Sequence, residues 1–254
     1  MKIVVCIKQV PDSETKVVIK EGENWIDDTG VNYVINPYDE YALEEAIRIK
    51  EKQGGEVIVV SLGPDRTVNS IRTALAMGAS SGIHIKANTM YHGLSAAKLL
   101  AETIKPLNPD LILLGKQAID DDNMQIGPMV AELLNLPCVT VVSKLDIIPS
   151  TQDGGTAERE IEGGKEIIEF PLPAVITAQK GLNEPRYPSL KGMMLAKSKP
   201  ITAVSRDTGA EIPSGITITS IEYPPKRQAG KIFSNGADAV PDVVRLLREE
   251  AKAI

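Results

Sequence analysis

The chain has 254 residues, of which 43% are hydrophobic and 24% are charged, and these proportions are typical of a soluble globular protein. Its net charge of −6, without a basic stripe, argues against nucleic acid as a partner, and two cysteines and two histidines are too few for a disulfide framework or a metal cluster. No stretch approaches the roughly 20 apolar residues that span a bilayer, and the apolar run 3–7 is too short for a signal peptide, so we expect a cytoplasmic protein without a membrane span.

The first half of the chain alternates apolar runs, which predict buried strands, with amphipathic stretches, which predict helices. The expected strands are 2–8, 56–62, 82–86 and 111–114, and the expected helices are 36–53, 66–77, 94–104 and a segment carrying the apolar stripe 126–134. Asn36 is expected to cap the first helix, with Pro37 at its first position, and the alternation in 16–20 suggests a small hairpin. Together these elements predict an α/β fold, a doubly wound parallel sheet with helices on both faces.

The second half of the chain has a different texture. β-branched residues alternate with charged ones in 139–148 and 158–170, which predicts a β-hairpin excursion, and the apolar run 172–179 is expected to return to the central sheet. The segment 183–200 has little periodicity and is expected to be an exposed loop. The rest is expected to form a C-terminal arm with a strand at 216–221 and a final helix.

The arm and its isolated helix leave apolar side chains without an obvious place in the main α/β domain, residues 1–182. Such side chains favour a permanent partner subunit that the arm, residues 201–254, contacts. The alternative is that the tail folds back on its own domain.

The stretch 109–135 organises the chain, because it has the pattern of a buried strand, a polar turn and a helix. In a parallel sheet the strand ends, here 6–9, 62–64 and 115–118, meet at one edge, where the first N–H groups of the following helices are free to bind a ligand. We therefore expect a ligand cleft at this edge. The aspartates 120–122 have two interpretations of equal weight, as caps of the helix or as part of a nucleotide site. The turn has neither a Walker loop nor a G-x-G-x-x-G fingerprint.

Five segments resemble, in the right order, the β subunit of electron transfer flavoprotein: IRTALAMGA, LGKQAIDDD, EREIEGG, LPAVITA and LNEPRYPSL. The likeness covers essentially the whole chain. It implies a heterodimer in which an α subunit holds most of the FAD site, while the β subunit binds a structural AMP and docks dehydrogenases. Electrons would pass from the dehydrogenases through the flavin toward a quinone-linked acceptor. Residues 1–182 are then the nucleotide-binding domain and 183–200 a recognition loop.

The resemblance also assigns roles to single residues. The AMP pocket is expected to comprise Cys6, Asn36, Leu62, Ala118, Asp121, Asn123, Met124, Gln125 and Ile126. Tyr38, Arg159 and Glu160 are expected near the partner's FAD, although alternating charges usually form a solvated strand face. Leu190 matches an anchor of the recognition loop. Two positions depart from the family's pattern, since Met124 and Ile126 stand where Asn and Thr are common.

Three functions are weighed on this basis. The favoured one is an electron-carrier subunit without catalytic or metal-binding residues. The second is an electron-bifurcating subunit with a second FAD in place of AMP, but Asp121 occupies the position where bifurcating relatives carry Gly and should obstruct a pyrophosphate. The third is a stand-alone adenine-nucleotide enzyme, which would need a glycine-rich phosphate loop where this chain has KQVPDSET.

Overall fold

The computed structural model describes residues 1–254 except 21, 23–24, 88–90, 148–153, 206–216 and 227–228. The chain divides into two compact units, Met1–Thr219 and Ser220–Ile254. Within the described ranges, no helix is both long and apolar enough to cross a membrane.

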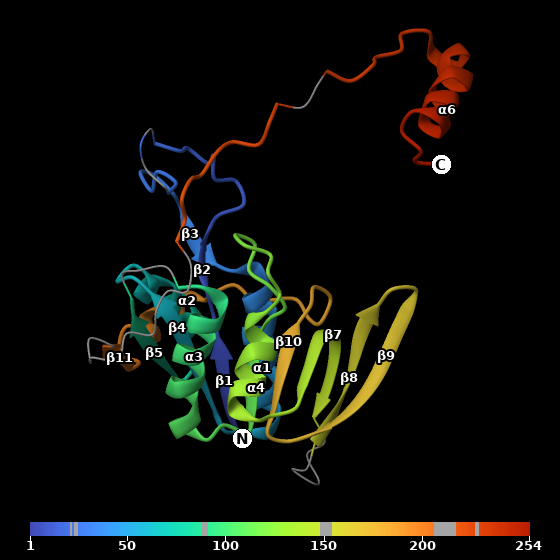
Figure 1. Ribbon diagram of the computed structural model, residues 1–254. Coiled ribbons are helices and arrows are strands. Elements are labelled where there is room, and N and C mark those ends of the chain that lie inside the picture. Colours follow the sequence, from blue (N-terminus) through green and yellow to red (C-terminus); the bar gives the residue numbers. More distant parts are fainter. Residues whose placement is uncertain (21, 23–24, 88–90, 148–153, 206–216, 227–228) are drawn as a thin grey trace. The chain divides into compact units, whose positions relative to one another are not determined.

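A nine-stranded sheet of described residues forms the centre of the first unit, in the order β11-β5-β4-β1-β6-β10-β7-β8-β9 (Figure 1). Its strands are β1 (Lys2–Cys6), β4 (Glu56–Gly63), β5 (Ser81–Lys86), β6 (Leu111–Gly115), β7 (Cys138–Ile147), β8 (Gly154–Ile161), β9 (Gly164–Pro171), β10 (Ala174–Ala178) and β11 (Ile201–Ser205). Neighbours from β11 to β7 run parallel, and β8 and β9 extend the sheet by antiparallel pairing.

Helices cover both faces of the sheet, as the sequence predicts. They are α1 (Pro37–Gln53), α2 (Thr67–Met77), α3 (Gly93–Ile104) with the 3-10 turn η1 (Lys105–Leu107), α4 (Ile126–Leu134) and the short α5 (Leu190–Ala196). Because successive strand residues point to opposite faces, Ile3 and Val5 pack in one apolar cluster with α1 and α2, whereas Val4 packs in a second cluster with α3 and α4. In Figure 1, α3 and α4 lie in front of the sheet. The doubly wound α/β prediction is confirmed.

The central strand β6 shows why the sheet is buried on both sides. All five residues of its sequence LILLG are buried, and an unbroken apolar run of this length is what a parallel strand between two helix layers requires. Each Leu or Ile side chain removed from water there contributes roughly 1.5–3 kcal/mol. The predicted core pattern is therefore confirmed for the strand that leads into the expected cleft.

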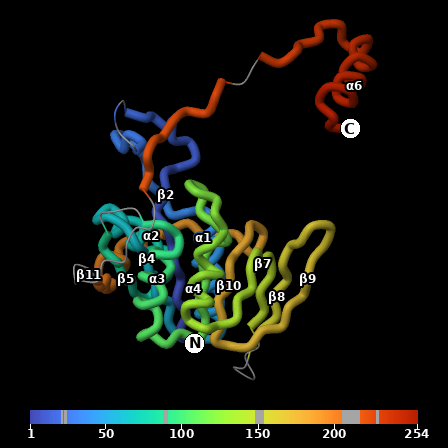
Figure 2. The backbone as a smooth tube through the Cα atoms, in the orientation of Figure 1, coloured from blue at the N-terminus to red at the C-terminus, as the bar shows by residue number. Residues whose placement is uncertain are grey.

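The hairpin and its return to the sheet are also as predicted. Strands β7, β8 and β9 pair antiparallel, with the second turn at Gly163, whose φ of 78° suits glycine. Part of the expected first turn lies outside the described residues. Strand β10 then enters between β6 and β7, parallel to both. Figure 2 shows β10 beside β7, on the side away from β8 and β9.

A small antiparallel ribbon rises from the rim of the first unit. It consists of β2 (Gln9–Pro11) and β3 (Tyr33–Ile35), and an isolated bridge joins Ile19 to Ile26 in the segment between them. The bridge confirms antiparallel pairing near the predicted hairpin at 16–20.

Three local features differ from the expected elements. Residues Ile201–Ser205, expected in the arm, form edge strand β11 beside β5. The expected loop 183–200 contains helix α5. No strand forms at 217–221, and residue 216 lies outside the described residues. The short sequence of β11 has no recognisable hydrophobic pattern of a strand. Only its pairing with β5 identifies it as one.

The second unit holds the final helix. It comprises η2 (Gly236–Ala239) and α6 (Val240–Glu249), and the carboxylate of Glu250 pairs with Lys231 Nζ at 2.8 Å. Every described residue of α6 is at least partly exposed, and the side chains of Val240 and Leu247 are 56% and 37% exposed. The predicted terminal helix is thus confirmed, with its apolar side open within this unit.

Candidate functional site

The order of the strands places a ligand crevice beside the carboxyl end of β1. From β1 the chain proceeds to β4 and β5 on one side, and then returns to β6 on the other side of β1. Ligands of open α/β sheets bind at such a reversal of strand order, outside the carboxyl ends of the strands. The helices α2, α3 and α4 each follow a strand of this sheet and therefore begin at the same edge.

Asn36 joins the end of β1 to the loop that follows β6. Its backbone N–H donates to Lys8 O at 2.9 Å, its Nδ2 donates to Gln117 O at 2.8 Å, and its Oδ1 accepts from the N–H of Ile119 at 3.2 Å. The side chain is only 1% exposed. Asn36 is the N-cap residue of α1, directly ahead of Pro37, as the sequence predicts, but its side chain is engaged with this loop and makes no capping bond to a backbone N–H of α1.

Asp39 forms a second bridge between the same two strands. Its Oδ2 accepts from the N–H of Lys8 at 2.7 Å and its Oδ1 from the N–H of Gly115 at 2.8 Å. Burial raises the pKa of this carboxyl to about 7, although both backbone bonds act in the opposite direction. A Cβ at Gly115 would lie 2.5 Å from Asp39 Oδ1 and 2.6 Å from Tyr38 Cβ, so the approach requires glycine.

The three aspartates of the turn are engaged away from the helix end. Lys8 Nζ pairs with Asp120 Oδ1 at 2.8 Å and with Asp121 Oδ2 at 3.0 Å, while Asp122 Oδ1 accepts from Gln117 Nε2 at 2.5 Å. Partial burial disfavours the charge on Lys8, but the two carboxylates outweigh this effect and raise the pKa of Lys8. Since α4 begins only at Ile126, the capping interpretation of these aspartates is wrong.

The loop between the aspartates and α4 has a strained, ordered backbone. Asp122 and Met124 have φ of 50° and 53°, whereas Asp121 between β6 and these residues does not have a positive φ. The N–H of Asp122 donates to Ala118 O at 2.9 Å, and the N–H of Asn123 to Asp121 Oδ1 at 3.3 Å. Within this loop the carboxylate of Asp121 therefore accepts one backbone bond, in addition to its ion pair with Lys8.

Helix α4 opens beside the start of α3. The side chain of Gln125 fills the space above Gly93, where an added Cβ would lie 2.2 Å from Gln125 Nε2. Gln125 is the N-cap residue, and no side chain of the described chain caps α4. Free N–H groups and the dipole at such a helix start favour an anion such as a phosphate.

Apolar residues lie where the inner wall of the expected crevice would be. Cys6, Leu62 and Ile126 belong to or pack on the same hydrophobic cluster, from the ends of β1 and β4 and the start of α4. Burial raises the pKa of the Cys6 thiol to about 12, so it is a small apolar side chain rather than a nucleophile. Of the remaining expected pocket residues, Asn123 and Met124 lie on the surface, Met124 with 43% of its area exposed.

The three residues expected near a flavin lie along the same sheet edge. Lys116 Nζ lies 5.2 Å from the centre of the Tyr38 ring, and the N–H of Lys116 donates to Ala178 O at 2.9 Å. Gln179 follows Ala178 in the chain, and its Nε2 donates to Glu160 Oε2 at 3.3 Å. Two strands, β10 and β7, therefore separate Tyr38 from Glu160.

Arg159 lies at an irregular part of the hairpin. It pairs in register with Val142, its Nη1 lies 3.6 Å from Glu166 Oε2, and its buried Nε has no partner within the described chain. The neighbouring Val141 has a φ of 61°, rare for a β-branched residue, and donates its N–H to Thr177 Oγ1 at 3.0 Å. The strained residue therefore adjoins Val142, the register partner of Arg159.

Leu190 is separate from this crevice. It is the first residue of α5, with 80% of its area exposed, and Tyr187 and Met194 nearby in sequence are 94% and 74% exposed. Ser189 is the N-cap of α5 and accepts from the N–H of Gly192 at 3.0 Å. This Ser is the one residue in the local sequence that indicates the start of a helix.

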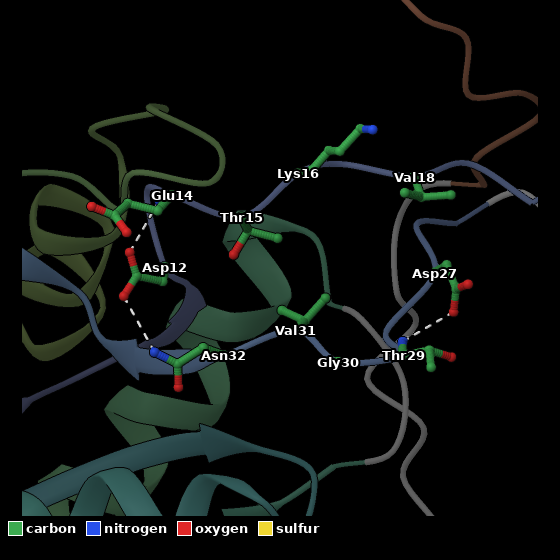
Figure 3. A pocket seen from close by; sticks show the side chains of 10 residues that line it. All are labelled: Asp12, Glu14, Thr15, Lys16, Val18, Asp27, Thr29, Gly30, Val31 and Asn32. Atoms are coloured by element: carbon green, nitrogen blue, oxygen red, sulfur yellow. Dashed lines mark hydrogen bonds between the residues drawn. The ribbon is translucent and has the colours of Figure 1, made fainter.

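A hollow of about 380 Å³ lies elsewhere, in the ribbon segment 12–32 (Figure 3). Its polar side chains already serve the ribbon itself, since Asp12 accepts from Asn32 Nδ2 at 3.3 Å and Asp27 accepts from the N–H of Thr29 at 3.0 Å. Because no residue of the nine-stranded sheet or of its helices contributes to the described lining, we place the candidate site at the sheet edge instead.

Two residues central to the site were missed from the sequence, Lys8 and Asp39. Lys8 is the last residue of the expected strand 2–8, and Asp39 lies within the expected helix 36–53. Their partners lie 31 to 113 residues away in the chain, so no local pattern reveals them.

Comparisons with known proteins identify the family of the chain. The Electron transfer flavoprotein domain matches residues 24–208. The mitochondrial electron transfer flavoprotein subunit beta of Arabidopsis thaliana is 43% identical, with all of both chains covered, and the subunit beta of Bacillus subtilis is 42% identical over the same full coverage. That of Syntrophomonas wolfei is 44% identical over 91% of this chain and 88% of its own. The chain therefore belongs to the electron transfer flavoprotein beta-subunit family.

Proposed function

We propose that this chain is the β subunit of a heterodimeric electron carrier whose FAD is held mainly by an α subunit. Members of this family carry electrons and are not enzymes in the usual sense, and the name of the relatives, subunit beta, implies an alpha partner. The observation that carries the proposal is the bridging of the ends of β1 and β6 by Asn36 and Asp39, at the switch point where the ligand crevice is expected.

The crevice suits an adenine nucleotide in the kinds of groups it offers. Cys6, Leu62 and Ile126 offer an apolar wall for a base, and the uncapped start of α4 offers N–H donors for a phosphate. Asn36 and Ala118 help to hold the loop that covers this wall. When bound, the nucleotide would supply a structural link between these elements and no redox chemistry.

AMP fits better than a second FAD. Lys8 and the N–H of Asn123 fix the carboxylate of Asp121, so its negative charge stays where a pyrophosphate would bring further negative charge. The backbone at 121 also has no positive φ and hence no need of glycine. This supports the AMP form over the bifurcating form, which remains the second candidate.

Electrons are expected to enter from dehydrogenases that dock on the segment 183–200 and to leave toward a quinone-linked oxidoreductase. The exposed Leu190, Met193 and Met194 on α5 support the docking role. Methionine side chains are flexible and polarisable, and such surfaces adapt to several partners. Arg159, Glu160 and Tyr38 are placed toward the partner's flavin by the same proposal.

The nucleotide content of the assembled protein tests the proposal. Co-expression with the α subunit, acid release and chromatography should give one AMP and one FAD per pair. Two FAD and no AMP would support bifurcation, and a pair without any adenine nucleotide other than FAD would refute the AMP site. Asp121→Gly in the same assembly should lower the AMP content if the fixed carboxylate orders the loop.

A further inference from the structure

Helix α5 is joined to helix α2 by side chains that reach in both directions. Arg72 on α2 donates from Nη1 to Ala196 O at 2.6 Å and to Lys199 O at 2.7 Å, just at and beyond the end of α5. Lys199 donates in return from Nζ to Leu75 O at 2.8 Å and Ala79 O at 2.6 Å, at the end of α2. A cation on α2 thus serves carbonyls at the end of α5, and a cation just beyond α5 serves carbonyls at the end of α2.

These contacts satisfy groups that a helix end leaves open. The last four carbonyls of a helix have no partner within it, and a cation there also complements the helix dipole. A second cation, Lys50 Nζ, donates to Gly78 O at 2.7 Å at the same end of α2. These bonds therefore hold α5 against the C-terminal end of α2.

The backbones of α5 and α2 also approach each other closely. At Gly192 in α5, an added Cβ would lie 2.2 Å from Ala76 O, and Ala196 is only 3% exposed. An isolated helix of seven residues is far too short to be stable in water. Its order therefore depends on the contacts with α2.

The opposite side of α5 is apolar and open. Leu190, Met193, Met194 and Leu195 are 80%, 45%, 74% and 50% exposed. The helix is thus held on α2 by its inner side and its C-terminal end while it displays an apolar outer side. A surface that is already ordered binds a partner at a smaller entropic cost than one that must order on contact.

We propose that Arg72 and Lys199 are positioning residues, which hold α5 on α2 in the orientation that a docking dehydrogenase recognises. The inference rests on the proposed docking role of residues 183–200 and adds to it the elements that preorganise that segment. The bonds of Arg72 both come from one nitrogen, so a lysine at this position is able to restore part of the contact.

Arg72→Gln in the assembled αβ protein tests the inference through two readouts. Hydrogen exchange of the amides in 190–196 should accelerate on the order of tenfold or more, because the helix then opens locally. The KM of a dehydrogenase for the assembled protein should rise on the order of tenfold, equivalent to about 1.4 kcal/mol, while kcat and the nucleotide content stay unchanged. Lys199→Gln should act in the same direction, and Arg72→Lys should recover part of both effects.

Lys98→Gln is the matched control, since Lys98 is an exposed cation of α3 on the other face of the sheet. It should leave both readouts at their wild-type values. If Leu190→Ala leaves the KM unchanged, the docking role itself is wrong. If Leu190→Ala raises the KM but Arg72→Gln and Lys199→Gln change neither exchange nor KM, the docking role stands and the positioning inference is overturned.

Discussion

At the scale of single residues, the site depends on Asp39 more than on the three aspartates that the sequence makes conspicuous. Asp39 is 5% exposed and accepts two backbone N–H bonds, one from each strand that flanks the crevice. Asp120 and Asp121 instead share one lysine at the surface, where ion pairs contribute little. A buried carboxylate that serves two donors is costly to replace, since a lost acceptor leaves an N–H unpaired.

The raised pKa of Asp39 predicts a pH dependence of stability. The carboxyl titrates at about 7 in the folded chain against an ordinary 3.8, so between these values the folded state binds more protons than the unfolded state. The contribution of Asp39 to the free energy of unfolding should therefore fall as the pH rises from about 4 to about 7. Urea unfolding of the assembled protein and of Asp39→Asn at several pH values measures it: the difference between them should shrink over this range, and a difference that grows with pH would contradict the assignment.

Asp39→Asn should also be less stable at every pH in that range. An amide accepts through one oxygen only, so its NH2 group would face the N–H of either Lys8 or Gly115. We expect a loss of about 1–3 kcal/mol. Glu40→Gln serves as the control, because Glu40 is the next acid of the same helical turn and is half-buried.

Gly115→Ala tests the close approach of α1 to β6. The new Cβ would meet the Asp39 carboxylate and the backbone of Tyr38 at 2.5–2.7 Å, and overpacking of this kind typically costs about 1–3 kcal/mol. Thermal unfolding should show the lower stability of Gly115→Ala. Its nucleotide content, measured separately, should also be lower. Gly164→Ala adds the same methyl group in open space and should leave both quantities unchanged.

At the scale of elements, the strands and helices with strong periodicity were predicted and the short ones were not. The buried run of β6 and the stripe of α4 identify themselves, because their residues face the core at the period of their own element. Helix α5 has only seven residues, and the described side chains of the edge strand β11 are exposed or half-buried, so neither has a recognisable core-facing pattern. They form because α2 and β5 offer contacts, which the local sequence does not encode.

The sequence predicts the position of the site but not the partners of its polar side chains. That the strand ends converge follows from the alternation of strands and helices, and the register of β1 with β4 and β6 confirms it. The partner of each polar side chain does not follow, since Asn36 meets Gln117 and Ile119 rather than its own helix. Resemblance to the family supplied Asn36 as a pocket residue, but not the bonds that it makes.

Leu190→Ala tests the exposed side of α5. A Leu buried in a partner's pocket contributes roughly 1.5–3 kcal/mol, and truncated anchors often cost at least about 2 kcal/mol. Coupling to a dehydrogenase should therefore weaken on the order of 10- to 100-fold, with flavin spectrum, AMP content and melting temperature nearly unchanged. Ile167→Ala on β9 removes a comparable apolar side chain, 75% exposed, and should leave coupling intact. Loss of the cofactors in Leu190→Ala would instead assign this residue a role in the fold.

At the scale of the whole molecule, the two units differ in how much they bury. The first unit has an apolar cluster on each face of its sheet. In the second, Ala239 is the buried hydrophobic residue among those described, and α6 leaves Val240 and Leu247 exposed on positions seven apart, hence on one side of the helix. A helix whose apolar side has no cover in its own unit is marginal in water unless a partner covers it.

Leu247→Glu should therefore weaken assembly with the α subunit while the first unit keeps its fold. Burial of Leu247 and its neighbours in a partner would contribute roughly 1.5–3 kcal/mol for each large side chain, and a carboxylate in an apolar contact adds a desolvation cost. We expect the dissociation constant of the heterodimer to rise at least on the order of tenfold, measured by sedimentation of the co-purified pair over a dilution series. Ala251→Glu places the same charge on an exposed residue just beyond α6 and controls for net charge. An unchanged dissociation constant in Leu247→Glu would show that the apolar side of α6 faces something other than the α subunit. A partner that covers Leu247 would bury the new charge without a counter-ion, and this would destabilise the complex.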